Sequence, residues 1–204
     1  IIVGGGPAGL FAAFYLSQNA DLDILLIEKG KVPHQRKCVM KESGVCASCQ
    51  PCNVLCGIGG AGLFSDGKLN FIPKLGKTDL TQFMPRHDAQ SLIDETEQIF
   101  ESLGMTGPVF PTDMEKARDL RKHALKQGID LLLIRQKHLG SDLLPDLISR
   151  MLDNLKQSIS VKTSEAVTDV VPEATGRIQV ISEKNRYQAE SVILAPGRSG
   201  ADWV

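Results

Sequence analysis

The N-terminal stretch IIVGGGPAG constrains the fold more than any other part of the sequence. It has the pattern of a buried strand, then a glycine turn of the form G-x-G-x-x-G at Gly4, Gly6 and Gly9, then a helix that begins near Pro7. A second apolar run, DILLIE, follows and ends in the acidic residue Glu28. A strand, glycine turn and helix followed by a strand that ends in an acid are typical of a dinucleotide-binding β-α-β unit.

Each part of this unit has a physical task. Gly4 permits the tight turn, Gly6 lets the backbone approach a pyrophosphate, and Gly9 lets the helix pack against the strand. The helix N-terminus offers N–H groups to phosphates, and Glu28 is suited to accept hydrogen bonds from ribose hydroxyls. The alternative is an ordinary glycine turn with Glu28 at a solvated strand end. We predict a Rossmann-like nucleotide site within residues 1–30.

The remaining sequence alternates between irregular and periodic segments. Residues 31–76 are rich in Gly, Cys and Pro, which indicates a long functional loop with at most a short helix. Helical spacing of apolar residues predicts helices over 78–104, 112–127 and 141–157. From Ile159 the period changes to two, which predicts a series of short strands that ends in the buried strand SVILAPG.

Composition excludes several classes of protein. Apolar residues make up 42% of the 204 residues and charged residues 23%, as in a folded globular chain. The net charge of −1 gives no reason to expect nucleic acid or a membrane surface as a partner. No apolar run approaches the roughly 18 residues that a membrane span requires.

Two groups of residues carry a resemblance to known proteins. The run VGGGPAGLFAAFYL…LLIEKG resembles the N-terminus of FAD-binding proteins of the glutathione-reductase type. The short strands followed by SVILAPGRSG are similar to the second FAD-contacting segment of that group. More narrowly, CGIGGAGLFSDGKLN with APGRSGADWV resembles a family of FAD-dependent dehydrogenases. The resemblance implies a further segment with a Gly-Asp pair for the ribityl chain, so we expect this sequence to be part of a longer protein.

The resemblance also implies which residues contact FAD. It assigns the backbone of Val167 to the adenine and places residues 57–70 along the pyrophosphate and the flavin. Lys68 is the catalytic candidate, because its charge would stabilise a reduced flavin anion; a surface lysine is the alternative. Arg36 and Arg198 are candidates for phosphate or substrate contacts, with surface positions as the alternative. The expected FAD-binding residues are Gly4, Gly6, Pro7, Ala8, Gly9, Glu28, Lys29, Gly60, Ala61, Gly62, Ser65, Asp66, Val167, Ala195, Pro196 and Gly197.

Four of the five cysteines follow the spacing C-x2-C-x2-C-x3-C. Cys46, Cys49, Cys52 and Cys56 thereby match the run that holds a [4Fe-4S] cluster in bacterial ferredoxins, and Cys38 could substitute for one of them. The residue after Cys56 is glycine rather than proline, so other interpretations stay open. These are a redox dithiol beside the flavin, a zinc site with four cysteine ligands, and free thiols packed in a loop. Clustered thiols without a signal peptide indicate a reducing cytoplasm.

We therefore expect an α/β fold, with a Rossmann-like FAD-binding domain, a β-meander and an inserted helical segment of the substrate domain. The FAD-binding domain is expected at residues 1–76 and 158–204, and the helical insertion on the substrate side at 77–157. The expected function is an FAD-dependent oxidoreductase that moves hydride or electrons between NAD(P)H or an electron-carrier protein and a small-molecule substrate. The alternatives are a flavin and iron–sulfur electron-transfer protein, or a non-catalytic module that binds nucleotide and metal.

Overall fold

The computed structural model describes residues 1–203, and the chain divides into two compact units. Unit 1 comprises Ile1–Ser65 and Leu144–Val204, and unit 2 comprises Asp66–Leu143. These boundaries differ by about a dozen residues from those expected from the sequence. The assignment of an FAD-binding domain and a substrate-side insertion stays a prediction.

Unit 1 is built on a four-stranded sheet with the order β11-β1-β2-β7, in which all neighbours are parallel. The helix α1 (Pro7–Asn19) connects β1 to β2, since two adjacent parallel strands require a crossover connection. The central strands are buried, with Ile2, Leu26 and Ile27 almost inaccessible to solvent. This arrangement confirms the predicted α/β class. The strands are β1 (Ile2–Val3), β2 (Leu25–Glu28), β7 (Ser160–Thr163) and β11 (Ile193–Leu194).

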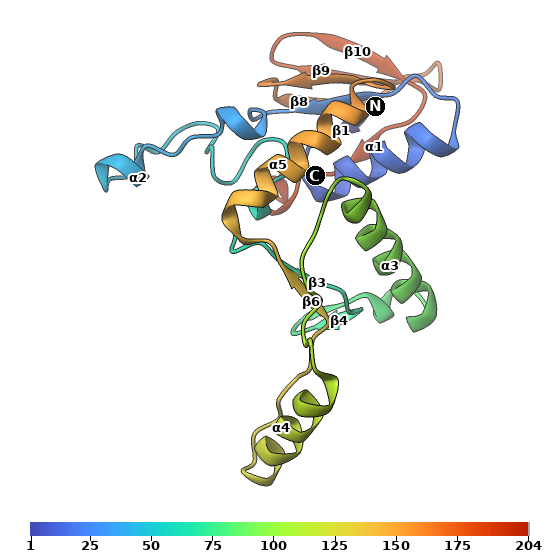
Figure 1. The fold of residues 1–204 in the computed structure, drawn as a ribbon. Coiled ribbons are helices and arrows are strands. Elements are labelled where there is room, and N and C mark those ends of the chain that lie inside the picture. The colour runs from blue at the N-terminus through green and yellow to red at the C-terminus, as the bar shows by residue number, and fades with distance from the viewer. Residues whose placement is uncertain (204) are drawn as a thin grey trace. The chain divides into compact units, whose positions relative to one another are not determined.

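A three-stranded antiparallel meander belongs to the same unit, and Figure 1 shows its strands β8 to β10 next to one another. One face of the meander packs on the sheet, because Val180 of β9 forms a buried cluster with Val3 and Ile27. Val170 and Tyr187 pack against this cluster. The meander was predicted from the two-residue period of the sequence. Its strands are β8 (Val167–Pro172), β9 (Ile178–Ser182) and β10 (Arg186–Ala189).

The other long helix of unit 1 is α5 (Gly140–Leu155), whose residues from Leu144 onward belong to the unit. It buries Leu147, Met151 and Leu155, which lie one turn apart on a single face. The long segment between β2 and unit 2 contains only short helical pieces, as the sequence predicted. The short helical pieces of unit 1 are η1 (Pro33–Gln35), α2 (Met40–Ser43), η2 (Ala61–Phe64) and η4 (Arg198–Gly200).

Unit 2 contains two helices and two pairs of very short strands. The helix predicted from residue 78 begins only at Arg86, directly after Pro85, so that prediction was wrong at its N-terminal end. The residues before it form β5 and a 3-10 turn instead, and the strand pairs were missed because strands this short show no period. The elements are β3 (Lys68–Asn70) paired with β6 (Gln136–His138), β4 (Lys74–Leu75) paired with β5 (Thr78–Asp79), η3 (Leu80–Gln82), α3 (Arg86–Ser102) and α4 (Met114–Lys126).

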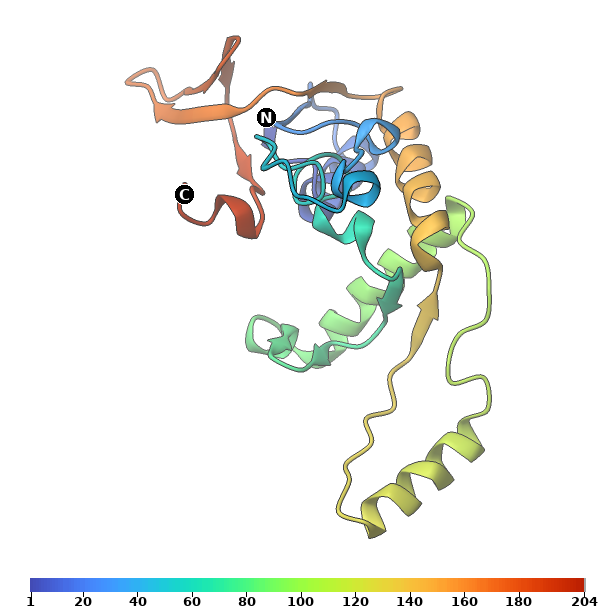
Figure 2. The same cartoon turned by 90° about the vertical axis from the view of Figure 1, so that its left-hand side faces the viewer.

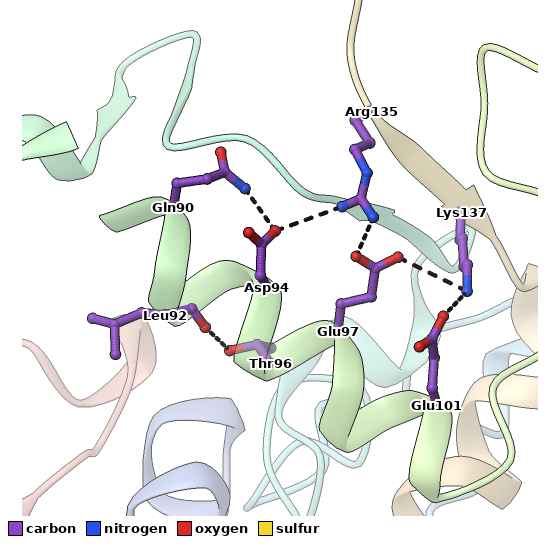
Figure 3. A network of polar contacts seen from close by, with 8 residues as sticks. All are labelled: Gln90, Leu92, Asp94, Thr96, Glu97, Glu101, Arg135 and Lys137. Atoms are coloured by element: carbon purple, nitrogen blue, oxygen red, sulfur yellow. Dashed lines mark hydrogen bonds and ion pairs between the residues drawn. The ribbon is translucent and has the colours of Figure 1, made fainter. Parts of the chain in front are cut away.

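Ion pairs tie β6 and the residue before it to α3, as Figure 3 shows. The buried carboxylate of Glu97, 5% exposed, lies 2.5 Å from Arg135 Nη2 and 3.8 Å from the Nζ of the equally buried Lys137. Lys137 Nζ also donates to Glu101 at 2.5 Å, and Arg135 Nη1 lies 3.9 Å from Asp94. The network therefore neutralises a buried acid with cations from a distant part of the chain.

The helix α4 lies at the end of an arm of unit 2. Asp113 caps its N-terminus by accepting hydrogen bonds from the N–H groups of Glu115 and Lys116, at 3.1 and 3.0 Å. Figures 1 and 2 both show α4 away from α3, with one extended segment leading from α3 to α4 and another leading from α4 to β6. Across the described range, no residue of α4 is buried. Within residues 1–203, no helix has the length and apolar character to cross a bilayer.

Candidate functional site

The glycine turn of residues 4–9 is fixed by the packing of unit 1. Gly4 has a φ of +107°, and its N–H donates to the carbonyl of Ile27 on β2 at 2.8 Å. A side chain on Gly4 would collide with the carbonyl of Ala195, and one on Gly9 would collide with the carbonyl of Gly4. Both positions must therefore be glycine for reasons of packing alone, and they bring the turn against the end of β11.

The N-terminus of α1 opens beside this turn. Gly6 is the N-cap residue and supplies no side chain to the first turn, in which Pro7 is the first helical residue. The first helical hydrogen bond runs from the N–H of Leu10 to the carbonyl of Gly6, at 2.9 Å. An uncapped helix N-terminus of this length favours the binding of an anion.

Glu28 at the end of β2 is buried, with 6% of its surface exposed, and backbone N–H groups hold both of its carboxylate oxygens. Its Oε2 accepts from Gly5 at 2.6 Å, and its Oε1 accepts from Gly30 at 2.7 Å and from Gly57 at 2.9 Å. A carboxylate offers about four lone-pair positions, so three bonds leave capacity for one more donor. Glu28 thus fixes three loops around one point and still borders the adjoining cavity.

That cavity encloses about 620 Å³ in unit 1. It brings together the glycine turn, the end of β2, the segment around Cys56, the turn before η2, and the loop after β11. These segments lie far apart in the sequence, and the cavity is large enough for part of a dinucleotide. Its lining residues are Gly6, Pro7, Glu28, Lys29, Leu55, Cys56, Gly57, Gly60, Ala61, Gly62, Ala195, Pro196, Gly197 and Arg198.

Two glycines in the lining have no packing reason to be glycine. A Cβ on Gly6 would find no protein atom closer than 3.9 Å, and one on Gly62 would find none within 4 Å. Neither residue has the positive φ that favours glycine. Their missing side chains therefore keep space open in the cavity rather than in the protein core. We call this open space at Gly6 and Gly62 the glycine cradle. It lies next to the uncapped N-terminus of α1 and has room for the pyrophosphate of a dinucleotide, which a side chain at Gly6 would displace.

Arg36 shapes the other side of the site, although it was expected to face phosphate, substrate or solvent. It is 3% exposed and donates hydrogen bonds to backbone carbonyls of the cysteine-containing segment. Its Nε donates to Asn53 at 2.9 Å, its Nη2 to Val54 at 2.8 Å and its Nη1 to Ile58 at 2.8 Å. Burial lowers the pKa of Arg36, and the nearby carboxylate of Glu28 opposes that shift. The expectation was wrong because Arg36 organises the loop.

The cysteines differ in exposure along that loop. Cys46 and Cys49 are exposed, Cys52 is half-buried, and Cys56 is buried at the wall of the cavity. The N–H of Cys56 donates to the carbonyl of Cys52 at 2.8 Å, so these two residues close one tight turn. Within residues 1–203, no three cysteine, histidine or acidic side chains come together in a group that could hold a metal ion. The metal assignment of the four cysteines stays a prediction.

The remaining expected site residues lie elsewhere. Gly4 and Gly9 belong to the glycine turn but do not line the cavity. Ala8, Ser65 and Val167 of unit 1 are also outside the cavity lining. Asp66 and Lys68 belong to unit 2, where the Lys68 Nζ lies 2.8 Å from Asp66 Oδ2 at the surface. The hydrogen bond from Lys68 lowers the pKa of Asp66.

Sequence reasoning missed two features of the lining. Leu55 was not expected there, and Cys56 was expected as a metal ligand, with a redox dithiol or a packed thiol as alternatives, and not as part of the nucleotide cavity. No pattern in the sequence marks either position as part of the nucleotide cavity. The loop places them there through the carbonyl contacts of Arg36.

The parallel sheet, the crossover helix and the glycine cradle define a Rossmann-like fold of the FAD-binding class. Residues 1–202 match the family of pyridine nucleotide-disulphide oxidoreductases, and the chain belongs to this family. The narrower family that shares the run GGAGLFSDGKLN is not established by this match. No curated protein matches the sequence.

Solved structures with a similar fold include an oxidase, a dehydrogenase and a Diels-Alderase. Glycine oxidase from Geobacillus kaustophilus has a TM-score of 0.56 at 18% identity, over 98% of this chain and 55% of that one. The 3-ketosteroid-delta4-(5alpha)-dehydrogenase from Rhodococcus jostii RHA1 has a TM-score of 0.52 at 13% identity, over 95% and 44% of the two chains. The Diels-Alderase PyrE3 of pyrroindomycin biosynthesis has a TM-score of 0.52 at 15% identity, over 97% and 32%. The chain thus spans about a third to a half of their lengths, and the likeness shows the fold alone.

Proposed function

We propose that unit 1 binds the adenine dinucleotide part of FAD in the cavity beside Gly6, and that the whole protein is a dehydrogenase which takes electrons from NAD(P)H or a protein carrier. The single observation that carries this proposal is the empty space over Gly6, where no protein atom requires a glycine. The family match supports a pyridine nucleotide as the electron donor. FAD supplies the hydride or electron chemistry when it is bound.

The residues of the site divide the work of binding. The backbone at Gly6 and Gly62 allows close approach of the pyrophosphate, and the N-terminus of α1 favours its negative charge. The remaining lone pair of Glu28 is available to a ribose hydroxyl, and its negative charge disfavours a 2′-phosphate there. Arg198, also in the lining, adds a positive charge to the cavity.

A pair of glycine variants tests the proposal in the full-length protein. Gly6→Val should fold normally and lose its bound flavin, because the new side chain occupies the cradle. Gly9→Val should instead fail to fold, because its Cβ would meet the carbonyl of Gly4. Gln18→Val, at an exposed position of the same helix, is the matched control and should retain flavin. Flavin absorbance and circular dichroism measure both effects; a folded Gly6→Val protein with full FAD content contradicts the assignment.

The electron donor requires a separate measurement. Anaerobic mixing of the flavin-loaded protein with NADH or NADPH should bleach the flavin absorbance within the time of turnover. Bleaching by neither nucleotide, together with bleaching by a reduced carrier protein, would assign the donor to a protein.

The substrate is proposed only as a small molecule. Within its family, we propose that the chain belongs to the narrower group of FAD-dependent dehydrogenases that share the run GGAGLFSDGKLN.

A second candidate function is electron transfer through an iron–sulfur cluster held by Cys46, Cys49, Cys52 and Cys56. The observation that favours it is the position of Cys56 in the wall of the cavity, which would bring a cluster near the flavin. Anaerobically purified protein should then contain about four irons per chain. Cys49→Ser should lose iron and keep FAD, since Cys49 is exposed and outside the cavity. Reversible dithiol oxidation without iron would favour the flavin-side dithiol, and stoichiometric zinc the structural site.

A further inference from the structure

Arg36 is buried next to the proposed FAD site, although it does not itself line the cavity. Its Nε, Nη2 and Nη1 donate to the carbonyls of Asn53, Val54 and Ile58, at 2.9, 2.8 and 2.8 Å. A guanidinium presents its N–H donors in a rigid planar fork, whereas a lysine amine presents its donors at a single point. Contacts to carbonyls spread along a segment therefore depend on the fork and not only on the positive charge.

The N–H groups of the same segment bind the nucleotide side of unit 1. The N–H of Gly57 donates to Glu28 Oε1 at 2.9 Å, and the N–H of Gly59 donates to the carbonyl of Gly5 at 2.8 Å. Arg36 Nη1 also donates to the carbonyl of Gly57, at the longer distance of 3.4 Å. The segment is thus held through its carbonyls by Arg36 and through its N–H groups by Glu28 and the glycine turn.

A further contact connects Arg36 to a second wall of the cavity. The central carbon of its guanidinium lies 5.0 Å from the centroid of the Phe64 ring, which is the geometry of a cation–π interaction. Phe64 ends the short helix η2, and Ala61 and Gly62 at the start of η2 line the cavity. One buried side chain therefore contacts both the segment around Cys56 and the helix η2.

We propose that Arg36 is a positioning residue of the FAD site, which fixes these two walls of the cavity before the cofactor binds. This inference rests on the proposed binding of FAD in the cavity. Arg36 acts through backbone carbonyls and through Phe64, and not by contact with the cofactor. Walls that are already ordered lose less conformational entropy on binding, so Arg36 increases the affinity for FAD.

The affinity of the deflavinated full-length protein for FAD tests this role. Arg36→Lys keeps the charge and loses the fork, so it should fold and raise the Kd for FAD about tenfold. Arg186→Met changes an exposed arginine of unit 1, and as the matched control it should leave the Kd unchanged. Circular dichroism without FAD establishes that each variant is folded at the temperature of the titration. A folded Arg36→Lys protein with the affinity of the wild type overturns the proposal.

The contact with the second wall has a test of its own. Phe64→Leu leaves the carbonyl contacts of Arg36 in place and should raise the Kd for FAD about threefold, through loss of the cation–π contact. An unchanged Kd would show that Arg36 does not position η2.

Chemical rescue separates positioning from a general loss of stability. Guanidinium chloride at millimolar concentration, far below the denaturing range, should restore part of the FAD affinity of Arg36→Ala, and sodium chloride at the same ionic strength should not. A folded Arg36→Ala protein that guanidinium does not rescue contradicts the positioning role.

The variant Gly6→Val distinguishes a failure of this inference from a failure of the proposed function. If folded Gly6→Val protein retains FAD, the cavity is not the FAD site, and the role of Arg36 there is rejected with it. If Gly6→Val loses FAD while Arg36→Lys and Phe64→Leu bind it as the wild type does, the cavity is the FAD site and only the positioning role is wrong.

Discussion

Unit 1 and unit 2 each bury a carboxylate, and they stabilise it by different means. Glu28 in unit 1 accepts hydrogen bonds from three backbone N–H groups of separate loops. Glu97 in unit 2 lies among side-chain cations, with Arg135 at 2.5 Å and Lys137 at 3.8 Å. Glu28 therefore acts on the backbone around a cavity, while Glu97 joins a helix to a distant strand.

The different partners of Glu28 and Glu97 indicate that the two carboxylates have different structural roles. Backbone donors cannot move without moving their loops, so Glu28 orders the segments that line the proposed nucleotide site. Side-chain cations reach across a gap and hold elements together without shaping a cavity wall. A third buried acid, Glu165, is intermediate: neutral side chains of Ser182, Asn185 and Tyr187 donate to its Oε1.

The largest effect is expected from Glu97→Ala. Removing the central acid leaves Arg135 without its nearest partner and the buried Lys137 with Glu101 alone. Because Glu101 still compensates Lys137, the loss in the free energy of unfolding should be about 3 kcal/mol, at the lower end of the range for a broken buried pair. Hydrogen exchange should increase in α3 and β6 and stay unchanged in the sheet of unit 1. Glu95→Ala on the same helix is the exposed control. An equal increase of hydrogen exchange in both units would contradict the inference that Glu97 stabilises unit 2 alone.

A smaller effect is expected from Glu28→Gln. The amide keeps one acceptor oxygen but places an N–H₂ group against a backbone donor, which costs about 1–3 kcal/mol. Because the affected donors belong to the site, flavin content should fall together with stability. Glu42→Gln, at an exposed position, should change neither. Loss of stability with unchanged flavin affinity would make Glu28 a structural residue like Glu97.

The contribution of Glu165 to the free energy of unfolding should depend on pH. Burial raises the pKa of Glu165, but the hydrogen bonds from Ser182, Asn185 and Tyr187 outweigh burial and hold it below its usual value. These bonds therefore stabilise the fold above the ordinary carboxyl pKa, and their contribution is lost as the pH falls through the lowered value. Tyr187→Phe should cost about 1–2 kcal/mol at pH 7. Denaturation between pH 7 and pH 3 should show this difference shrinking; a constant difference would contradict the hydrogen bond to a charged acid.

The smallest effect on stability is expected from Lys68→Gln. The ion pair with Asp66 is exposed on both sides, and such pairs contribute about 0–1 kcal/mol. If Lys68 stabilises the reduced flavin as proposed, flavin reduction should slow by on the order of 10²-fold while stability stays nearly the same. Stopped-flow reduction and thermal unfolding of the same sample separate the two. An unchanged rate of flavin reduction would show that Lys68 is an ordinary surface residue.

Local patterns determined much of unit 1 in advance. The glycine turn, the helix behind it and Glu28 at the end of β2 follow from the periodicity and the spacing of a few residues, and the parallel sheet confirms the α/β class. The meander was predictable for the same reason. Helix α3 was only partly predictable, because the helical period continued past Pro85 into residues that form a strand and a turn.

Only the tertiary structure decided which distant backbone groups meet. The sequence gives no sign that the N–H of Gly57 lies at Glu28, or that Arg36 donates to the carbonyls of Asn53 and Val54. Backbone N–H and carbonyl groups are the same in nearly every residue, so a hydrogen bond to them leaves no mark in the residue types. Packing brings these groups together, and packing likewise decides that Gly6 faces open space while Gly9 faces a carbonyl.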